Sequence, residues 1–293
     1  MVITITGATG TIGTELVRLL SATHVPVRAV SRGSDKSPRQ PGVVWIQADL
    51  HDRTVLEPAL AGTTRLFLLS SNEAGFGTLQ TEVLHAAERL GVEHVVKLSA
   101  LGASDHSNSG IAREHWMVEQ ALQQTGMTWT ILRPHAFMQN WLGEVAESVR
   151  REGKIYSAID DGRVPFIDTR DIAAVALEAL LHPETHAGHR YFLTGGAAIG
   201  YRDLAAALTD LTGRSITYQP ISMDEARARM ESRGVAPAEI AALLAIQAYQ
   251  RAGGPTSMVS DKVEHILGRP PRTIQEFARD YAAHFGGSDA PEA

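Results

Sequence analysis

The sequence has 293 residues, of which 44% are hydrophobic and 20% charged, the values of a globular protein with a sizeable core. Its 33 acidic residues outnumber 27 basic ones and no long basic stripe occurs, which argues against nucleic acid as a partner. The absence of cysteine excludes disulfides, thiolate metal sites and cysteine nucleophiles. The first strand begins at residue 2, with no room for a signal peptide, and apolar runs such as 171–181 are too short to span a bilayer. A cytoplasmic protein with no membrane partner is expected.

Short apolar segments alternate with helical ones through the first two-thirds of the chain. This alternation predicts an α/β fold, in which a doubly wound parallel sheet carries helices on both faces. The helices are predicted around Leu16–Leu20 and over 53–61, 78–90 and 111–124. The strands are predicted at 2–6, 25–30, 43–47, 65–70, 94–100, 128–134 and 189–195.

The pattern loosens after Pro134 and predicts a smaller, mostly helical lobe that binds the substrate. A short strand and a helix are predicted within 164–181, and a turn at 252–257. The other predicted helices cover 136–152, 201–212, 223–233, 237–251 and 273–284. The predicted division is a Rossmann domain over 1–135, completed by about 160–195, a substrate lobe over 136–159 and 196–285, and a disordered tail over 286–293.

The first predicted turn carries the pattern G-x-x-G-x-x-G. Glycines allow a tight turn, a close approach of backbone to phosphate, and close packing of helix on strand. The N-terminus of the following helix offers free N–H groups to a pyrophosphate. A glycine-rich turn without a ligand is the alternative. The predicted cofactor contacts here are Gly7, Thr9, Gly10, Thr11, Ile12 and Gly13.

The ends of the second and third strands suggest which dinucleotide is bound. Ser31 and Arg32, with Lys36 nearby, stand where enzymes that prefer NAD place a carboxylate. An arginine can pair with a 2′-phosphate, so NADP is predicted, although a solvent-exposed arginine is the alternative. Asp49 and Leu50 are predicted to flank the adenine, and Asp49 can also cap a helix.

These residues resemble the NmrA-like branch of the atypical short-chain dehydrogenases. The resemblance spans nearly the whole chain, from "ITGATGTIG" through "AAERLGVEHVVKLSALGA" (86–103) to "FIDTRDIAAVA" (166–176). It is strongest to NADPH-dependent quinone reductases and to azo- and triphenylmethane-dye reductases. It implies a Rossmann domain, a small substrate domain, and NADP(H) bound across the three glycines and Arg32.

The chain departs from typical short-chain dehydrogenases because it lacks their Tyr-x-x-x-Lys pair. None of its six tyrosines has a lysine four residues later, and the matching helix reads His115-x-x-x-Glu119. His115 is a candidate proton donor, or a residue that packs beneath the ligand or binds substrate. Glu119 is expected to be solvated or structural. Ser99 stands where typical relatives keep a catalytic serine.

The remaining candidates lie at strand ends. Lys97, inside the fifth predicted strand, is expected either to reach the cofactor or to line a wall of the site. The loop "RPHAFMQNWL" (133–142) lies beside the nicotinamide in the family, where its apolar side chains form either a flat pocket or core. Phe76 is expected to touch the substrate from a mobile flap over 72–77. The cofactor candidates are Ser70, Ser71, Asn72 and Pro134, and the substrate candidates are His135, Phe137, Met138, Asn140 and Trp141.

Other patterns are set aside. His182, His186 and His189 are interpreted as an exposed loop rather than a metal site, so no metal is predicted. Asp160 and Asp161 are interpreted as a turn, and no G-x-S-x-G element supports a serine hydrolase.

The prediction is an NADPH-dependent reductase of a small quinone-like or similar conjugated aromatic acceptor. The alternatives are a non-catalytic NAD(P) redox sensor, as NmrA is regarded, and a tailoring reductase of secondary metabolism. The oligomeric state stays open, with a homodimer as one option.

Overall fold

The computed structural model describes residues 1–33 and 40–286, which form two compact units. Unit 1 consists of Met1–His135, Thr169–Leu193 and Lys262–Arg269, and unit 2 of Ala136–Asp168, Thr194–Asp261 and the described residues from Pro270 on. Residues 160–168, predicted to complete the first domain, fall in unit 2, and 262–269 fall in unit 1. Lys36 and the predicted tail, except Gly286, lie outside the described residues.

Unit 1 is built on a parallel sheet of seven strands in the order β3-β2-β1-β4-β5-β6-β8. This confirms the α/β fold class. All seven predicted strands are present, most of them shortened at one or both ends. They are β1 (Ile3–Ile5), β2 (Val27–Ser31), β3 (Val43–Gln47), β4 (Arg65–Leu68), β5 (His94–Leu98), β6 (Thr128–Pro134) and β8 (His189–Leu193).

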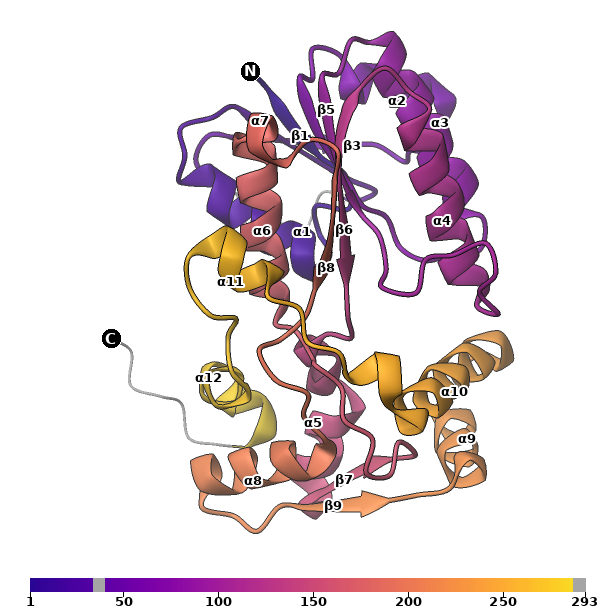
Figure 1. The fold of residues 1–293 in the computed structure, drawn as a ribbon, viewed down its shortest axis with the longest axis vertical. Coiled ribbons are helices and arrows are strands. Elements are labelled where there is room, and N and C mark those ends of the chain that lie inside the picture. The colour runs from indigo at the N-terminus through magenta and orange to yellow at the C-terminus, as the bar shows by residue number, and fades with distance from the viewer. Residues whose placement is uncertain (34–39, 287–293) are drawn as a thin grey trace. The chain divides into compact units, whose positions relative to one another are not determined.

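Helices cover both faces of this sheet. Helices α2 (Arg53–Leu60), α3 (Phe76–Arg89) and α4 (Gly110–Gln123) lie on one face. Helices α1 (Thr11–Ser21) and α6 (Thr169–Leu181) lie together on the other (Figure 1). Unit 1 also includes α7 (Pro183–His186) and α11 (Lys262–Leu267), and α11 packs on α6.

Side-chain caps fix where α2 and α4 begin, and an apolar core packs these helices on the sheet. The carboxylate of Asp52 accepts a hydrogen bond from the Thr54 N–H and starts α2, and the Ser109 hydroxyl accepts one from the Ala112 N–H and starts α4. Leu66, Leu68 and Val95 are buried between the sheet and α3 and α4. Helices cover both faces of a parallel sheet, so neither face is open to a ligand. In this architecture ligands bind at the carboxyl ends of the strands.

Unit 2 is smaller and mostly helical, with one parallel pair of strands. Trp141, Phe166 and Phe277 centre its main core, where the Trp141 ring lies 4.7 Å from Phe166 and 5.5 Å from Phe277. Its strands are β7 (Lys154–Ser157) and β9 (Thr217–Pro220). Its α-helices are α5 (Glu144–Glu152), α8 (Tyr201–Thr212), α9 (Met223–Ser232), α10 (Pro237–Ala252) and α12 (Ile274–Asp280), and its 3₁₀ helices are η1 (Met138–Leu142), η2 (Gly254–Ser257) and η3 (Ala282–Phe285).

The structure corrects several predicted elements of unit 2. The helix predicted over 136–152 is divided into η1 and α5, because Gly143 leaves the helical conformation at φ −89°, ψ −114°. The strand predicted before α6 is reduced to single bridges of Val164 with Ile199 and of Ile167 with Phe137. The helix predicted over 273–284 becomes α12 followed by η3. Strands β7 and β9 were not predicted.

Two further corrections concern segments 182–189 and 262–267. The histidine segment is not an exposed loop throughout, because His186 ends α7 and is buried, with its Nδ1 3.0 Å from the Tyr191 hydroxyl. Helix α11 was missed. The predicted turn at Asp160–Asp161 is confirmed.

Candidate cofactor site

The turn between β1 and α1 shows what each glycine of the motif does. Gly7 has a φ of +61°, and a Cβ there would lie 2.8 Å from the Leu69 carbonyl oxygen. A Cβ at Gly13 would lie 2.2 Å from the Gly7 carbonyl oxygen. Both glycines are therefore required by the packing of the chain itself. A Cβ at Gly10 would meet only the Gly7 oxygen, at an ordinary contact distance of 3.4 Å, so the packing of the chain itself does not require a glycine at this exposed position.

The start of α1 is suited to an anion. Within the described structure no side chain caps this helix end, and its first turn has no acidic residue. Thr9, Gly10 and Thr11 are exposed, while Ile12 is buried in the core. The first N–H groups of a helix have no intrahelical acceptor, and the helix dipole favours negative charge there. The turn thus fits the pyrophosphate of a dinucleotide.

A charged cluster lies at the ends of β2, β3 and β4. The Arg32 guanidinium donates to both carboxylate oxygens of Glu73, with Nη2–Oε1 at 3.0 Å and Nη1–Oε2 at 3.4 Å. The Ser71 hydroxyl donates to the same Glu73 Oε1 at 2.9 Å. Asp49 is exposed and its Oδ1 lies 2.9 Å from His51 Nδ1. We call Arg32, Ser71 and Glu73 the Arg32–Glu73 cluster.

The neighbouring cofactor candidates are less available. Ser31 is buried and its hydroxyl donates to the Gly33 carbonyl oxygen at 2.6 Å. Leu50 is half-buried against two apolar clusters of unit 1. Ser70 is half-buried and accepts a hydrogen bond from Gln80 Nε2 at 2.7 Å, while Asn72 is exposed.

Lys97, His115 and Phe76 are buried together beneath the sheet edge. Lys97 Nζ lies 3.2 Å from His115 Nδ1 and donates to the Leu98 carbonyl oxygen. The Phe76 ring centroid lies 4.8 Å from that of His115. Phe76 is the first residue of α3 and is only 2% exposed, so it is part of a packed helix start and not of an open flap.

Burial sets the protonation of this group. It lowers the pKa of Lys97 to about 7, partly opposed by the attraction of Glu119. Burial also lowers the pKa of His115, and the positive charges of Lys97 and Arg133 lower it further. His115 is therefore neutral near pH 7, where a neutral imidazole is a poor proton donor.

Glu119 is fully buried and holds the ends of α4, β5 and β6 together, so of its two expected roles the structural one is observed and the solvated one is wrong. Its carboxylate accepts from Arg133 Nε at 2.8 Å and Nη2 at 2.6 Å, and from the Ser99 hydroxyl. Arg190 Nε lies 3.2 Å from Glu119 Oε2 but makes no hydrogen bond there. We call these four residues the Glu119 network, and in it the proton of Ser99 is directed to Glu119.

The segment after β6 divides the remaining candidates between the two units. Pro134 and His135 are buried in unit 1, where the His135 N–H donates to the Leu193 carbonyl oxygen at 2.9 Å. In unit 2, Met138 and Trp141 are each 2% exposed in the core, so we assign them to packing. Phe137 is half-exposed and Asn140 exposed.

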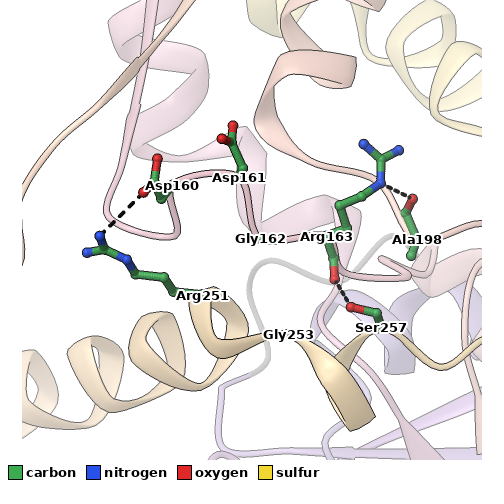
Figure 2. Close-up of a pocket in the computed structure, with 8 residues that line it drawn as sticks. All are labelled: Asp160, Asp161, Gly162, Arg163, Ala198, Arg251, Gly253 and Ser257. Atoms are coloured by element: carbon green, nitrogen blue, oxygen red, sulfur yellow. Dashed lines mark hydrogen bonds and ion pairs between the residues drawn. The ribbon is translucent and has the colours of Figure 1, made fainter.

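A shallow pocket of about 410 Å³ lies within unit 2, and it contains none of the predicted residues (Figure 2). Its charges are already paired: Asp160 with Arg251 at 3.3 Å, Asp161 with Arg202 at 3.0 Å and Arg163 with Asp203 at 3.0 Å. The pocket is lined by Asp160, Asp161, Gly162, Arg163, Ala198, Arg251, Gly253 and Ser257.

Residues 1–33 and 40–286 bear on metal binding and on membrane-spanning helices. No group of three or more histidine, aspartate or glutamate side chains among them is placed to hold a metal ion. No helix in the described ranges has the length and apolar character needed to cross a membrane.

The parallel sheet, its order around β1 and the glycine turn define a Rossmann-type α/β protein. The chain belongs to the NmrA-like family, whose profile matches residues 1–278. It is 35% identical to an NAD(P)H azoreductase of Xenophilus azovorans over 98% of this chain and 100% of the relative. It is 33% identical to a (4-alkanoyl-5-oxo-2,5-dihydrofuran-3-yl)methyl phosphate reductase of Streptomyces griseus over 99% of this chain and 100% of the relative.

The solved structures agree in fold. The NADPH-dependent quinone oxidoreductase QOR2 of Escherichia coli, determined in complex with NADPH, superposes with a TM-score of 0.83 at 29% identity. That similarity covers 96% of this chain and 99% of the other.

Glu73, Gln80 and the arginine partners of Glu119 were not singled out from the sequence. Arg133, a charged residue within the apolar run of β6, was a usable signal, because a buried charge requires a partner of opposite sign.

Proposed function

We propose that this protein is an NAD(P)H-dependent oxidoreductase that reduces a quinone, an azo compound or a similar conjugated acceptor. The observation that carries the proposal is the β1–α1 turn, where the exposed Gly10, which the chain's own packing does not require, stands at an uncapped helix N-terminus. Full-length similarity to an NAD(P)H azoreductase and to an NADPH-bound quinone oxidoreductase supports the same chemistry.

The chain's own groups would bind and orient the cofactor. The first N–H groups of α1 would bind the pyrophosphate, and Arg32 a 2′-phosphate. When bound, the reduced nicotinamide supplies a hydride. Together with protons from solvent, this balances a two-electron reduction of the acceptor.

Of the two predicted catalytic residues, His115 and Ser99, neither is free to donate the accompanying proton. His115 has a lowered pKa, and the Ser99 hydroxyl is directed to Glu119. We therefore propose that water protonates the product and that the protein contributes mainly binding and orientation. This suits acceptors whose reduction is limited by hydride transfer.

The test is NADPH and NADH oxidation with a panel of quinones, azo dyes and enones. We expect consumption with one acceptor class. Gly10→Ala should weaken NADPH binding about tenfold or more, equivalent to about 1.4 kcal/mol, and leave the melting temperature nearly unchanged. Gly110→Ala is the matched control, since its Cβ would meet only Arg113 Nη2 at 4.0 Å. No consumption with any acceptor would contradict the reductase proposal.

A second variant tests the source of the proton. His115→Phe preserves a ring against Phe76 but removes both ring nitrogens. We expect kcat within about threefold of the parent. A loss of about a hundredfold or more would instead identify His115 as the general acid.

A non-catalytic dinucleotide sensor is the second candidate, favoured by the missing Tyr-x-x-x-Lys pair and the neutral His115. A sensor binds NADP⁺ and NADPH with different affinities and consumes neither. The Streptomyces relative supports a third variant, a tailoring reductase acting on a conjugated metabolite.

A homodimer and a cytoplasmic location also stay predictions. Light scattering of the purified protein and fractionation of producing cells would test them.

A further inference from the structure

Arg32 already has an anionic partner, which the sequence did not suggest. Glu73 follows β4, 41 residues after Arg32, and its carboxylate receives both the Arg32 guanidinium and the Ser71 hydroxyl. The side chains of Arg32 and Glu73 are 59% and 55% exposed. The pair is therefore accessible to a ligand, and an exposed ion pair is weak enough to be exchanged for another partner.

The position of Glu73 is fixed by the start of α3. The Glu73 carbonyl oxygen accepts from the Phe76 N–H at 3.1 Å. The next turn is fixed by the Glu114 carboxylate, which accepts from the Gly77 N–H at 2.7 Å. The segment enters α3 through Gly75 at a φ of +84°. These contacts hold the Glu73 side chain opposite Arg32.

Glu73 is ionised at neutral pH. The hydrogen bonds from Ser71 and Arg32 lower its pKa, and nearby His51 adds to the effect. Asp49, on the neighbouring strand end, adds a second carboxylate to the same surface. An incoming 2′-phosphate would therefore meet Arg32 with two of its five N–H donors engaged by Glu73, and would be repelled by that carboxylate.

We infer that Glu73 is a specificity-determining residue, which competes with the 2′-phosphate for Arg32 and so reduces the preference for NADPH over NADH. The inference rests on the proposed cofactor but not on turnover. A ribose 2′-hydroxyl carries no charge and can donate a hydrogen bond to Glu73, so NADH does not meet this competition.

The test is calorimetric titration with adenosine 2′,5′-bisphosphate and with 5′-AMP, which differ only in the 2′-phosphate. For Glu73→Gln we expect the bisphosphate to bind about three- to tenfold tighter, and 5′-AMP to change less than about twofold. The gain should shrink at high salt. Glu57→Gln is the matched control, because it removes the same charge from the exposed Glu57–Arg89 pair and should change neither affinity.

The outcomes separate the inference from the proposed function. The double variant Arg32→Ala/Glu73→Gln should lose the gain, because the competed guanidinium is absent. An unchanged or weaker bisphosphate affinity in Glu73→Gln would overturn the inference, as would an equal gain for 5′-AMP. If neither probe, nor NADPH, binds the parent protein, the proposed function fails and the inference with it.

Discussion

Unit 1 contains two networks of arginine and carboxylate groups that differ in burial. In the Glu119 network the carboxylate is fully buried and is bound by Arg133 and Ser99. In the Arg32–Glu73 cluster both charged side chains are more than half exposed. An arginine attracts a carboxylate in both networks, but only the Glu119–Arg133 pair is removed from water. Removing one partner of that buried pair leaves an uncompensated buried charge. The buried Glu119 network therefore stabilises the fold, whereas the exposed Arg32–Glu73 cluster is available to a ligand.

The largest effect should come from Glu119→Gln, which leaves Arg133 buried without a carboxylate. We expect the free energy of unfolding to fall by about 3 kcal/mol or more. Urea denaturation measures it. Glu57→Gln, the same change in an exposed pair, is the control and should leave the denaturation midpoint in place. Equal effects of the two substitutions would remove the distinction between the networks.

The next effect is a pH dependence from Lys97, which adjoins the Glu119 network. Its folded pKa of about 7 lies below the ordinary 10.5, so between these values the unfolded chain binds a proton that the folded protein lacks. The free energy of unfolding should therefore rise with pH from about 7, by at most about 1.4 kcal/mol per pH unit. Measuring the free energy of unfolding of the parent and of Lys97→Met at pH 7, 8 and 9 isolates the contribution of Lys97 to this slope. If the free energies of the two proteins change in parallel with pH, the prediction is refuted.

A smaller effect is expected from Ser99→Ala, which removes one donor from Glu119 but leaves Arg133 in place. The loss of stability should be about 1.5 kcal/mol, the lower end of the range for a hydrogen bond to a charged group, because Glu119 keeps its arginine partner. Activity should persist once the variant is folded. If kcat falls about a hundredfold while the unfolding transition is unchanged, Ser99 is catalytic and not structural.

The smallest effect on stability should follow Glu73→Gln. Since the pair is exposed, the denaturation midpoint should match that of the parent within error at 0.15 M salt. A clear loss would show that the Arg32–Glu73 cluster contributes to the fold. The same preparation serves the ligand titrations, so stability and cofactor preference are compared directly.

The sheet of unit 1 was predictable because its buried parallel strands are continuous apolar runs bounded by turns. Strands β7 and β9 were not, because each has four residues and their paired residues lie 63 positions apart in the sequence, with no local signal. The division of the helix at Gly143 depends on tertiary packing that outweighs helical periodicity.

The residues of the candidate site were predictable where a short sequence pattern identifies them. The glycine turn and Arg32 follow directly from the chain, but the partners do not. Glu73 could have been suggested by the strand order, because β2 and β4 flank β1 and their ends meet the same edge. The burial of Glu119 depends on Arg133, which lies 14 residues later and is adjacent only once α4 packs on β6.

The return of residues 262–269 to unit 1 has a consequence for synthesis of the protein. Helix α11 packs on α6, and Arg269 Nη2 lies 2.8 Å from the buried Asp171 carboxylate. Translation proceeds at roughly 5–20 residues per second, so the nascent sheet waits several seconds for this last piece after β8 has emerged from the ribosome. A purified chain ending before residue 262 should thus be more sensitive to protease than the full chain, although all seven strands of the sheet are present in both.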